Sequence, residues 1–566
     1  MKWPYEIVNQ PDEVKHARRI LLDRYGFYAQ LSAVAVIICL QLVPLGRWIV
    51  KNATARSRAE YDAVPTADAA KTQKPNRRSW WISRTYQRGH WWLGDEVRIA
   101  NCTLGRRDEW FFGGLWAAWL LFLCVNQTGT DYHHLTKRFG QIAVSQFPLQ
   151  YLLATKRLNP VAFAFRTSHE NVNRWHRVLG YITYTLALLH GAFYLNFYIQ
   201  IGGLGRAFGR LVPVLGMLGL VSMTLLSTTA MGVVRRWSYR VFIVTHLVVA
   251  FAMPPLIWFH VHHARLFMVE AGLVYVADVV WRFCATVKAS AVVEFVPGAE
   301  LIKVVAKVPP GKGQKFGAYP GGGHAYLSLN GRWRAGLICN PFTVAAVNEE
   351  TGELTFVIRR RDGPLSNRLA ELAKAQATGT GVKLNVDGPY GVSAHFPNLA
   401  GPEFEQVLLV AGGVGATFIL PLYEHILAEN AAANVKLIWA VRDADEVSWP
   451  VLASGGRITD DSRVELFVTS GRRGSSSSDG TEPGDIEMES LEKASGSSVR
   501  VKIPVEKHKR PDLQAILDDV FREETRGRVA VVVCGPVEMA RDVRNAVGFW
   551  VGMGKDVWFH NESFGW

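Results

Sequence analysis

The sequence predicts a multi-domain membrane protein, with an all-α bundle of about seven transmembrane helices followed by an antiparallel β-barrel and an α/β domain. The chain has 566 residues, which is enough for roughly three or four domains. Long apolar runs are confined to residues 28–286. The remainder alternates apolar and polar residues, as soluble α/β proteins do.

Charge and cysteine usage exclude several classes of protein. The net charge is +14, but much of the Lys and Arg excess lies between apolar runs, which indicates membrane orientation and not nucleic-acid binding. Six cysteines are scattered without CxxC spacing, so neither a disulfide framework nor a zinc site is expected. The N-terminal segment lacks the apolar core of a signal peptide, and we expect the first apolar run to remain as an anchor.

Seven runs approach the roughly 20 residues that cross a bilayer. They are 28–50, 110–126, 138–156, 174–197, 211–233, 239–260 and 264–284, of which the second and third are short or interrupted by polar residues. The loop 51–108 holds twelve Lys and Arg, and alternate loops hold fewer. The positive-inside rule then predicts an outer N-terminus and a cytosolic C-terminal half. Of the sequons at Asn52, Asn101, Asn126 and Asn561, only Asn126 faces outside in this topology.

The C-terminal half reads as two domains. Alternating strands with PGGG and DGP turns predict an antiparallel barrel over 287–400. Strands and helices then alternate over 401–566, as in a parallel βαβ sheet. Residues 471–499 are of low complexity and predict a disordered insertion, open to phosphorylation. The expected domains are therefore 1–137, 138–286, 287–400 and 401–566.

Four histidines give the strongest functional signal. His176 and His190 lie 14 residues apart, as do His246 and His260. This spacing puts both members of a pair on one helix face, roughly 21 Å apart along the axis. Imidazole inside a bilayer is costly, and haem iron takes axial histidines. Because a complete helix separates the two His helices, they run in the same direction. We therefore expect one haem between His176 and His246, and an outer haem between His190 and His260.

Alternatives remain for these histidines. A single intramembrane histidine is often a hydrogen-bonded core residue, although a doubled and equally spaced set argues against this. His262 and His263 lie close enough to replace His260 as a ligand, to dock a metal, or simply to cap the helix end. Pro254 and Pro255 interrupt backbone hydrogen bonding and predict a kink.

Residues after two barrel strands suit a flavin. Asn340, Pro341, Phe342 and Thr343 follow a predicted strand, where a hydroxyl and the backbone can bind the flavin ring. Arg359 and Arg360 precede a turn, which suits a pyrophosphate. Standing alone, this basic stretch would equally be a solvated strand end.

The α/β domain carries nucleotide-binding signals at strand ends. Gly412, Gly413, Gly415 and Thr417 lie between a strand and a helix, where the backbone can approach phosphates. Arg442 follows the next strand and suits the 2′-phosphate of NADPH, although Asp443 comes directly after it. Cys534, Gly535 and Pro536 end another strand, where the thiol lies beside the nicotinamide or is simply packed. Phe564 and Trp566 end the sequence and are expected to stack on the flavin, unless they form a frayed tail.

In this order, the His pairs, NPFT, GGVGAT, CGP and the final ESFGW resemble the fungal ferric/cupric reductases, which share a transmembrane superfamily with the NADPH oxidases. The resemblance covers about 138–566. It implies a six-helix core with two b-type haems and a ferredoxin-reductase-like module with FAD and NADPH, held by the residues named above. One departure is Asn340, where the family usually has histidine.

The resemblance also implies an activity. Electrons from cytosolic NADPH would pass through FAD and the haems to an extracellular ferric or cupric chelate or siderophore, with no catalytic acid or nucleophile. This fits iron uptake at the plasma or vacuolar membrane, beside an iron permease or ferroxidase. A superoxide-producing NADPH oxidase is the alternative, and the equal 14-residue spacings favour metal reduction. A non-catalytic transporter or scaffold is disfavoured because all four histidines and the glycines are present.

Overall fold

A computed structural model describes residues 4–8, 10–59, 77–99, 102–309, 311–329, 339–361, 363–375, 381–450, 458–469, 510–522 and 527–562. The chain forms two compact units, Met1–Ala285 and Thr286–Trp566, called here the N-terminal and C-terminal units. The predicted insertion 471–499 and the aromatic residues Phe564 and Trp566 lie outside the described residues.

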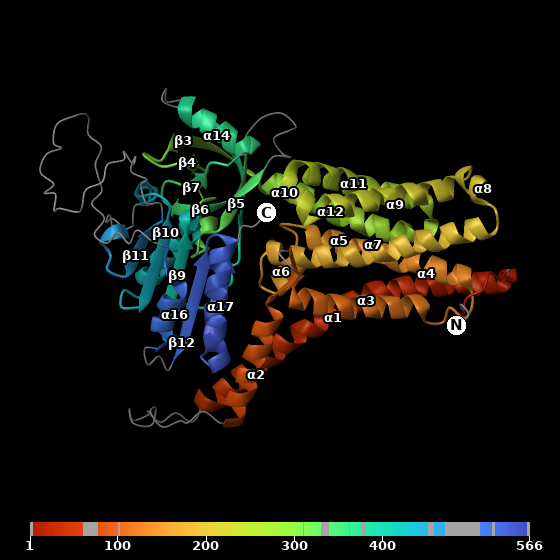
Figure 1. Cartoon of the computed structure of the whole chain (residues 1–566), viewed down its shortest axis with the longest axis horizontal. Coiled ribbons are helices and arrows are strands. Elements are labelled where there is room, and N and C mark those ends of the chain that lie inside the picture. Colours follow the sequence, from red (N-terminus) through yellow and green to blue (C-terminus); the bar gives the residue numbers. More distant parts are fainter. Residues whose placement is uncertain are drawn as a thin grey trace, which may run out of the picture. The chain divides into compact units, whose positions relative to one another are not determined.

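Long helices lie side by side in the N-terminal unit (Figure 1). They are α1 (Asp12–Ala59), α3 (Arg107–Val125), α7 (His169–Gln200), α9 (Leu211–Thr229), α11 (Tyr239–His260) and α12 (Arg265–Ala285). By length and composition, α3, α7, α9, α11 and the part of α1 up to Val50 can cross a membrane. Helix α12 coincides with the seventh predicted run, but it carries Glu270, Asp278 and Arg282 and is not among these five.

The third predicted span, 138–156, is wrong as one continuous helix. It forms parts of α4 (Tyr132–Ser145) and α5 (Phe147–Ala154), which are separated at Gln146. Pro148 lies in the first turn of α5, where its missing N–H costs nothing and where a new helix can begin. Helix α4 packs against α1, α3 and α7, and α5 packs against α7 and α12.

Helix α11 is continuous through Pro254 and Pro255. A proline removes the hydrogen bond to the carbonyl four residues earlier, which for Pro254 belongs to Ala250. The Tyr151 hydroxyl, on α5, donates to that Ala250 carbonyl. A neighbouring helix therefore supplies one of the donors that the prolines remove.

Shorter elements complete the N-terminal unit. They are α2 (Arg77–Leu93), the antiparallel pair β1 (Glu96–Ile99) and β2 (Cys102–Arg106), α6 (Pro160–Ala164), α8 (Leu204–Phe208), α10 (Gly232–Trp237) and the 3-10 turn η2 (His262–Ala264).

The C-terminal unit begins with the predicted antiparallel barrel. Its strands are β3 (Val287–Phe295), β4 (Leu301–Lys307), β5 (His324–Leu329), β6 (Asn340–Asn348), β7 (Glu353–Arg359) and β8 (Val382–Tyr390), closed in the order β3-β4-β7-β6-β5-β8. Alternate side chains, including Val304, Leu327 and Phe356, fill the interior. Helices α13 (Gln314–Gly317) and α14 (Pro364–Ala375) pack on the barrel, and η4 (Ser393–His395) follows it.

The predicted parallel α/β domain follows. Strands β9 (Phe404–Gly412), β10 (Val435–Val441), β11 (Val464–Val468), β12 (Arg528–Cys534) and β13 (Val557–Glu562) form one parallel sheet in the order β11-β10-β9-β12-β13. The helical elements are η5 (Gly413–Gly415), α15 (Ala416–Glu429), η6 (Ala444–Val447), η7 (Ile458–Asp460), α16 (Leu513–Arg522) and α17 (Val537–Met553). The strand order reverses between β9 and β12, and ligands of such sheets bind at that switch point.

Candidate functional site

The four predicted histidines form two facing pairs between α7 and α11. The ring centres of His176 and His246 are 6.0 Å apart, and those of His190 and His260 are 6.5 Å apart. An imidazole nitrogen binds a metal at about 2 Å, so two imidazoles on opposite sides of one iron have ring centres roughly 6 Å apart. Both pairs therefore have the spacing that an axially ligated haem needs.

Backbone carbonyls orient three of the four rings. The Nδ1 atoms of His176, His190 and His260 lie 2.9, 2.8 and 2.9 Å from the carbonyl oxygens of Gln150, Thr136 and Val212, respectively. A carbonyl only accepts, so each Nδ1 carries the proton and each Nε2 keeps its lone pair. Metal-binding histidines are commonly oriented in this way.

The fourth ring is held differently. His246 Nδ1 is buried and has no hydrogen-bond partner among the described residues. Burying an imidazole without a partner is costly, and a ligand on the ring is one way to offset that cost. His246 faces His176, and no carbonyl of the described residues bonds to its Nδ1, so the protein does not fix its tautomer as it does for the other three.

Two glycines make room for the second pair. A Cβ atom added to Gly140 of α4 would lie 2.7 Å from His190 Nδ1, and one added to Gly216 of α9 would lie 2.7 Å from His260 Cε1. These helices reach the imidazoles only because glycine has no side chain.

The neighbouring histidines have other contacts. His260 is the residue that faces His190, whereas His263 Nδ1 lies 3.0 and 3.1 Å from the two carboxylate oxygens of Asp23 on α1. The rings of His262 and His263 have centres 3.8 Å apart. These two residues therefore form a separate group on η2.

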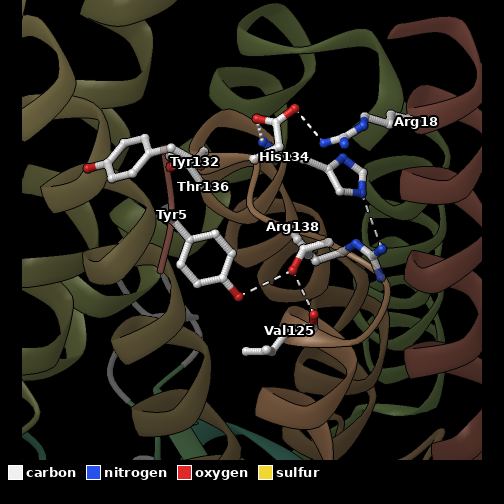
Figure 2. A network of polar contacts seen from close by, with 9 residues as sticks. Tyr5, Arg18, Val125, Tyr132, His134, Thr136 and Arg138 are labelled. Carbon is white, nitrogen blue, oxygen red and sulfur yellow. Dashed lines mark hydrogen bonds and ion pairs between the residues drawn. The ribbon is translucent and has the colours of Figure 1, made fainter. Parts of the chain in front are cut away.

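A buried polar network on α4 was missed from the sequence (Figure 2). Arg138 is fully buried, donates to the Leu123 carbonyl at 3.0 Å and lies 3.3 Å from His134 Nε2. Its guanidinium also lies over the Tyr25 ring, 3.6 Å from the ring centre. Leu123 is in the last turn of α3, where a cation complements the helix dipole. The feature of the sequence that could have revealed this network is a charged residue, Arg138, at the start of an apolar run.

The same network joins the N-terminal segment to the α3–α4 loop. Asp131 accepts from the His134 backbone N–H at 3.0 Å and pairs with Arg18 of α1. The Tyr5 and Thr128 hydroxyls are 3.3 Å apart, and Thr128 donates to the Val125 carbonyl. The start of the chain and the α3–α4 loop therefore lie at one end of the N-terminal unit.

In the C-terminal unit, the predicted flavin motif lies beside the start of α15. Phe342 and Thr343 pair with Ala325 and His324 of β5. Gly322, with φ +50°, lies between the flavin motif on β6 and the nucleotide motif at the start of α15. A Cβ atom on Gly322 would be 2.7 Å from the Val344 carbonyl oxygen and 3.0 Å from that of Thr417. Asn340 and Pro341 begin the same strand. The Gly-rich turn thus lets the barrel and the nucleotide motif approach closely.

Arg359 and Arg360 have different surroundings. Arg359 Nη2 donates to the buried Glu446 carboxylate at 2.7 Å and would lie 3.2 Å from a Cβ atom on Gly413. Arg360 is exposed. Arg359 therefore reaches the glycine turn from the barrel, and it already has an anionic partner there.

The two predicted nucleotide turns meet at the switch point between β9 and β12. A Cβ atom on Gly415 would lie 2.1 Å from the Cys534 carbonyl oxygen, and one on Gly412 would lie 2.6 Å from Pro536 and 3.2 Å from Gly535. Gly413 has φ +54°, a conformation that favours glycine.

Two further predicted contacts differ in exposure. The Thr417 hydroxyl donates to the Val414 carbonyl at 2.8 Å and is buried, so it serves the helix start in this structure. Arg442 and Asp443 are exposed after β10, beside the same edge of the sheet. An exposed cation there suits a ribose phosphate.

Cys534 is a packed thiol with an acidic neighbour that was not predicted. Burial, and then the nearby Glu562 carboxylate, raise the pKa of the Cys534 thiol well above its ordinary value. Glu562 is in register with Cys534 on β13, and its carboxylate lies 2.8 Å from His560 Nε2. The thiol stays protonated, so no thiolate chemistry is expected.

Comparison with known proteins agrees with this architecture. Residues 139–269 match the family described as "Ferric reductase like transmembrane component", and residues 404–548 match "Ferric reductase NAD binding domain". A relative in Meyerozyma guilliermondii, named "Probable metalloreductase AIM14", is 24% identical over 76% of this chain and 85% of its own length. The Saccharomyces cerevisiae "Ferric/cupric reductase transmembrane component 2" is 25% identical over 73% of this chain and 58% of its own length.

Among solved structures, "Ferredoxin reductase in carbazole 1,9a-dioxygenase" is 17% identical, with 50% of this chain and 69% of that chain covered and a TM-score of 0.32. The two domain matches occur in the same order along the chain as the motifs. The chain therefore resembles ferric reductases in two segments, a transmembrane component over residues 139–269 and a NAD-binding domain over residues 404–548.

Proposed function

We propose that this protein is a transmembrane metalloreductase that passes electrons from NADPH, through FAD and two b-type haems, to a ferric or cupric chelate on the other side of a membrane. The observation that carries the proposal is the pair of facing imidazoles at two depths, with ring centres 6.0 and 6.5 Å apart. The match of residues 139–269 to ferric reductase transmembrane components supports it, as do the five helices among the described residues that are able to cross a membrane.

The chain's own residues bind and orient the cofactors. His176 and His246 hold one haem, and His190 and His260 hold the other, with three Nδ1 atoms fixed on carbonyls. When bound, FAD takes a hydride and releases electrons singly, and haem carries one electron at a time. The long spacing within each helix, roughly 21 Å along the axis, places the two histidine pairs at different depths, where each would hold its own haem.

For the soluble cofactors, we assign FAD to Asn340–Thr343 and Arg359, and NADPH to Gly413, Gly415 and Arg442. The turns that hold these residues approach closely around Gly322 and at the switch point. No proton transfer by a side chain is needed for metal reduction. The protonated Cys534 thiol then acts as packing beside the nucleotide.

We assign residues 138–286 to the haem core, 287–400 to the FAD domain and 401–566 to the NADPH domain, with 1–137 as an extension. The Lys- and Arg-rich loop supports a cytosolic C-terminal unit. The plasma membrane, and a role in iron uptake beside a permease or ferroxidase, fit this orientation.

A reduced-minus-oxidised spectrum of membranes that contain the full chain tests the proposal. NADPH should produce haem bands, and a ferric chelate should abolish them without superoxide. Purified His190→Ala protein should keep about half the haem of wild type, since one axial pair remains. His16→Ala, an exposed histidine on α1, is the matched control.

Two outcomes would contradict it. Reoxidation by oxygen alone, with superoxide, would indicate an NADPH oxidase. An absence of haem from the wild-type protein would favour a transporter or scaffold.

A further inference from the structure

A histidine cluster that the electron path does not use lies on η2, between α11 and α12. It consists of His262, His263 and Asp23, whose carboxylate holds His263 Nδ1 at 3.0 and 3.1 Å. The His263 and Asp23 side chains are 16% and 41% exposed, and His262 is exposed. The cluster is therefore open to a ligand from outside the helices.

We propose that His262 and His263 form a docking site for Cu(II), presented as a small anionic chelate, at the end of the helices where His260 lies. The proposal rests on the proposed function, because it names the substrate class of that metalloreductase. It adds a site that is separate from the four axial histidines.

The geometry suits a metal with two imidazole ligands. Asp23 accepts the Nδ1 proton of His263, which leaves Nε2 with its lone pair for a metal. The ring centres of His262 and His263 are 3.8 Å apart. Two imidazoles on adjacent positions of one metal have ring centres roughly 4.5 Å apart when each bond is about 2 Å. The two rings are close enough to share one ion once they turn so that a nitrogen of each faces it.

The donor types favour copper. Among divalent first-row ions Cu(II) binds nitrogen ligands most tightly, and imidazole suits it, whereas carboxylate and other oxygen ligands suit harder ions. Two guanidinium groups, of Arg19 and Arg265, and the carboxylate of Asp23 act electrostatically on His262, so cationic groups outnumber the anionic one and a bare dication is disfavoured. A copper complex with an anionic chelator such as citrate fits both the imidazoles and the guanidinium groups.

The position suits an electron acceptor. His262 and His263 follow His260 by two and three residues, and His260 faces His190. Each NADPH supplies two electrons, so the balanced reaction is NADPH + 2 Cu(II) → NADP⁺ + 2 Cu(I) + H⁺. Cu(I) prefers thiolate and thioether ligands, so reduction weakens its binding to imidazole and favours release.

The test compares two substrates that share a chelator. Purified full-length protein is given Cu(II)-citrate or Fe(III)-citrate with NADPH, and the variants are His262→Ala, His262→Ala with His263→Ala, and the control His16→Ala. We expect the double variant to raise KM for Cu(II)-citrate by about 10-fold or more, with the Fe(III)-citrate KM changed by less than about 2-fold. The control should match wild type for both.

Binding is read independently of activity. Electron paramagnetic resonance of oxidised protein with one equivalent of Cu(II) should show nitrogen hyperfine coupling, which the double variant loses and His16→Ala keeps. Asp23 is a positioning residue, so Asp23→Asn should weaken copper binding by about 10-fold and Asp23→Glu should restore part of it.

Equal KM changes for both metals, or no nitrogen-coupled copper signal in wild type, would overturn the proposal. His262→Ala removes only an exposed ring, so it keeps the test valid if the double variant loses its haem. Failure of the proposed function is a different result: the wild type would then lack haem bands that NADPH reduces, whatever its copper signal.

Discussion

Two glycines control access to the imidazoles of the second histidine pair. Because a Cβ atom at residue 140 or 216 would lie 2.7 Å from the ring of His190 or His260, Gly140→Ala and Gly216→Ala should each displace one ring. We expect loss of about half the haem and a loss of stability of about 1–3 kcal/mol from overpacking. Haem content by absorption and thermal unfolding measure these effects.

Matched controls exist on neighbouring helices. Nothing lies within 4 Å of a Cβ atom added to Gly114 of α3 or Gly272 of α12. These alanine variants should keep their haem, since alanine also favours the helix. Full haem content in Gly140→Ala would show that α4 can move away, and that the close approach is not required for ligation.

At the same scale, the sequence predicts which histidines share a helix face but not how their rings are oriented. Equal 14-residue spacings place His176, His190, His246 and His260 on matching helix faces. The acceptors that fix three rings are main-chain carbonyls of Gln150, Thr136 and Val212. Any residue type supplies a carbonyl, so only tertiary packing reveals these contacts.

Between elements, the Arg359–Glu446 pair links β7 to η6. The side chains are 21% and 4% exposed, and they bond at 2.7 Å. Arg359→Ala leaves a buried carboxylate without this partner, which should cost about 3 kcal/mol and also reduce bound FAD. Thermal unfolding and the flavin-to-protein ratio are the measurements.

The double variant separates the two roles of Arg359. Glu446→Gln removes the charge that Arg359→Ala would leave uncompensated. The double variant should therefore recover part of the stability that Arg359→Ala loses. FAD content should stay low in the double variant, because the guanidinium is still missing. Recovery of both quantities together would mean that Arg359 supports the fold and does not bind the pyrophosphate.

The Asp461 carboxylate anchors the edge strand β11. Hydrogen bonds from Arg463, with a smaller effect from the Tyr423 hydroxyl, lower its pKa from 3.8 to about 2. The unfolded chain therefore binds the proton first, and the contribution to stability is present above pH 3.8 and lost as pH falls toward 2. Asp461→Asn should flatten the dependence of unfolding on pH in this window.

Hydrogen exchange of β11 measures this local effect without full unfolding. Asp460→Asn is the neighbouring control, because Asp460 is on η7, whereas Asp461 accepts the hydrogen bonds from Tyr423 and Arg463. An unchanged pH profile in Asp461→Asn would mean that other carboxylates control the edge of the sheet.

Elements that are bounded by glycine and proline turns were predictable. The barrel and the parallel sheet follow from short strands separated by glycine and proline turns, and their strand order is not evident from those turns. The break at Gln146 was missed because apolar residues continue on both sides of it. The span of α11 was predicted, but its substitute donor was not, because Tyr151 lies 99 residues away from Ala250 along the chain.

At the scale of the whole molecule, function depends most on which end of the helices faces outward. The N-terminal segment and the α3–α4 loop lie together, since Glu6 pairs with Asp131, and Asp131 with Arg18. The N-terminal segment and the α3–α4 loop therefore lie on the same side of the membrane. The positive-inside rule predicts that this side is the outside.

An added glycosylation site tests this topology. Gly202 follows α7, has φ +61° and has open space around it, and asparagine tolerates that conformation better than most residues. Gly202→Asn with Leu204→Thr creates a sequon there, in an Asn126→Gln background that removes the natural outer site. We expect a mobility shift that an endoglycosidase reverses.

The natural sequon at Asn52 is the internal control, because the same topology places it in the cytosol, where it stays unmodified. A glycan at Asn52 with none at residue 202 would invert the orientation. His190, His260 and the η2 histidines would then face the cytosol, and neither an external chelate nor the proposed copper site would be reached from outside the membrane.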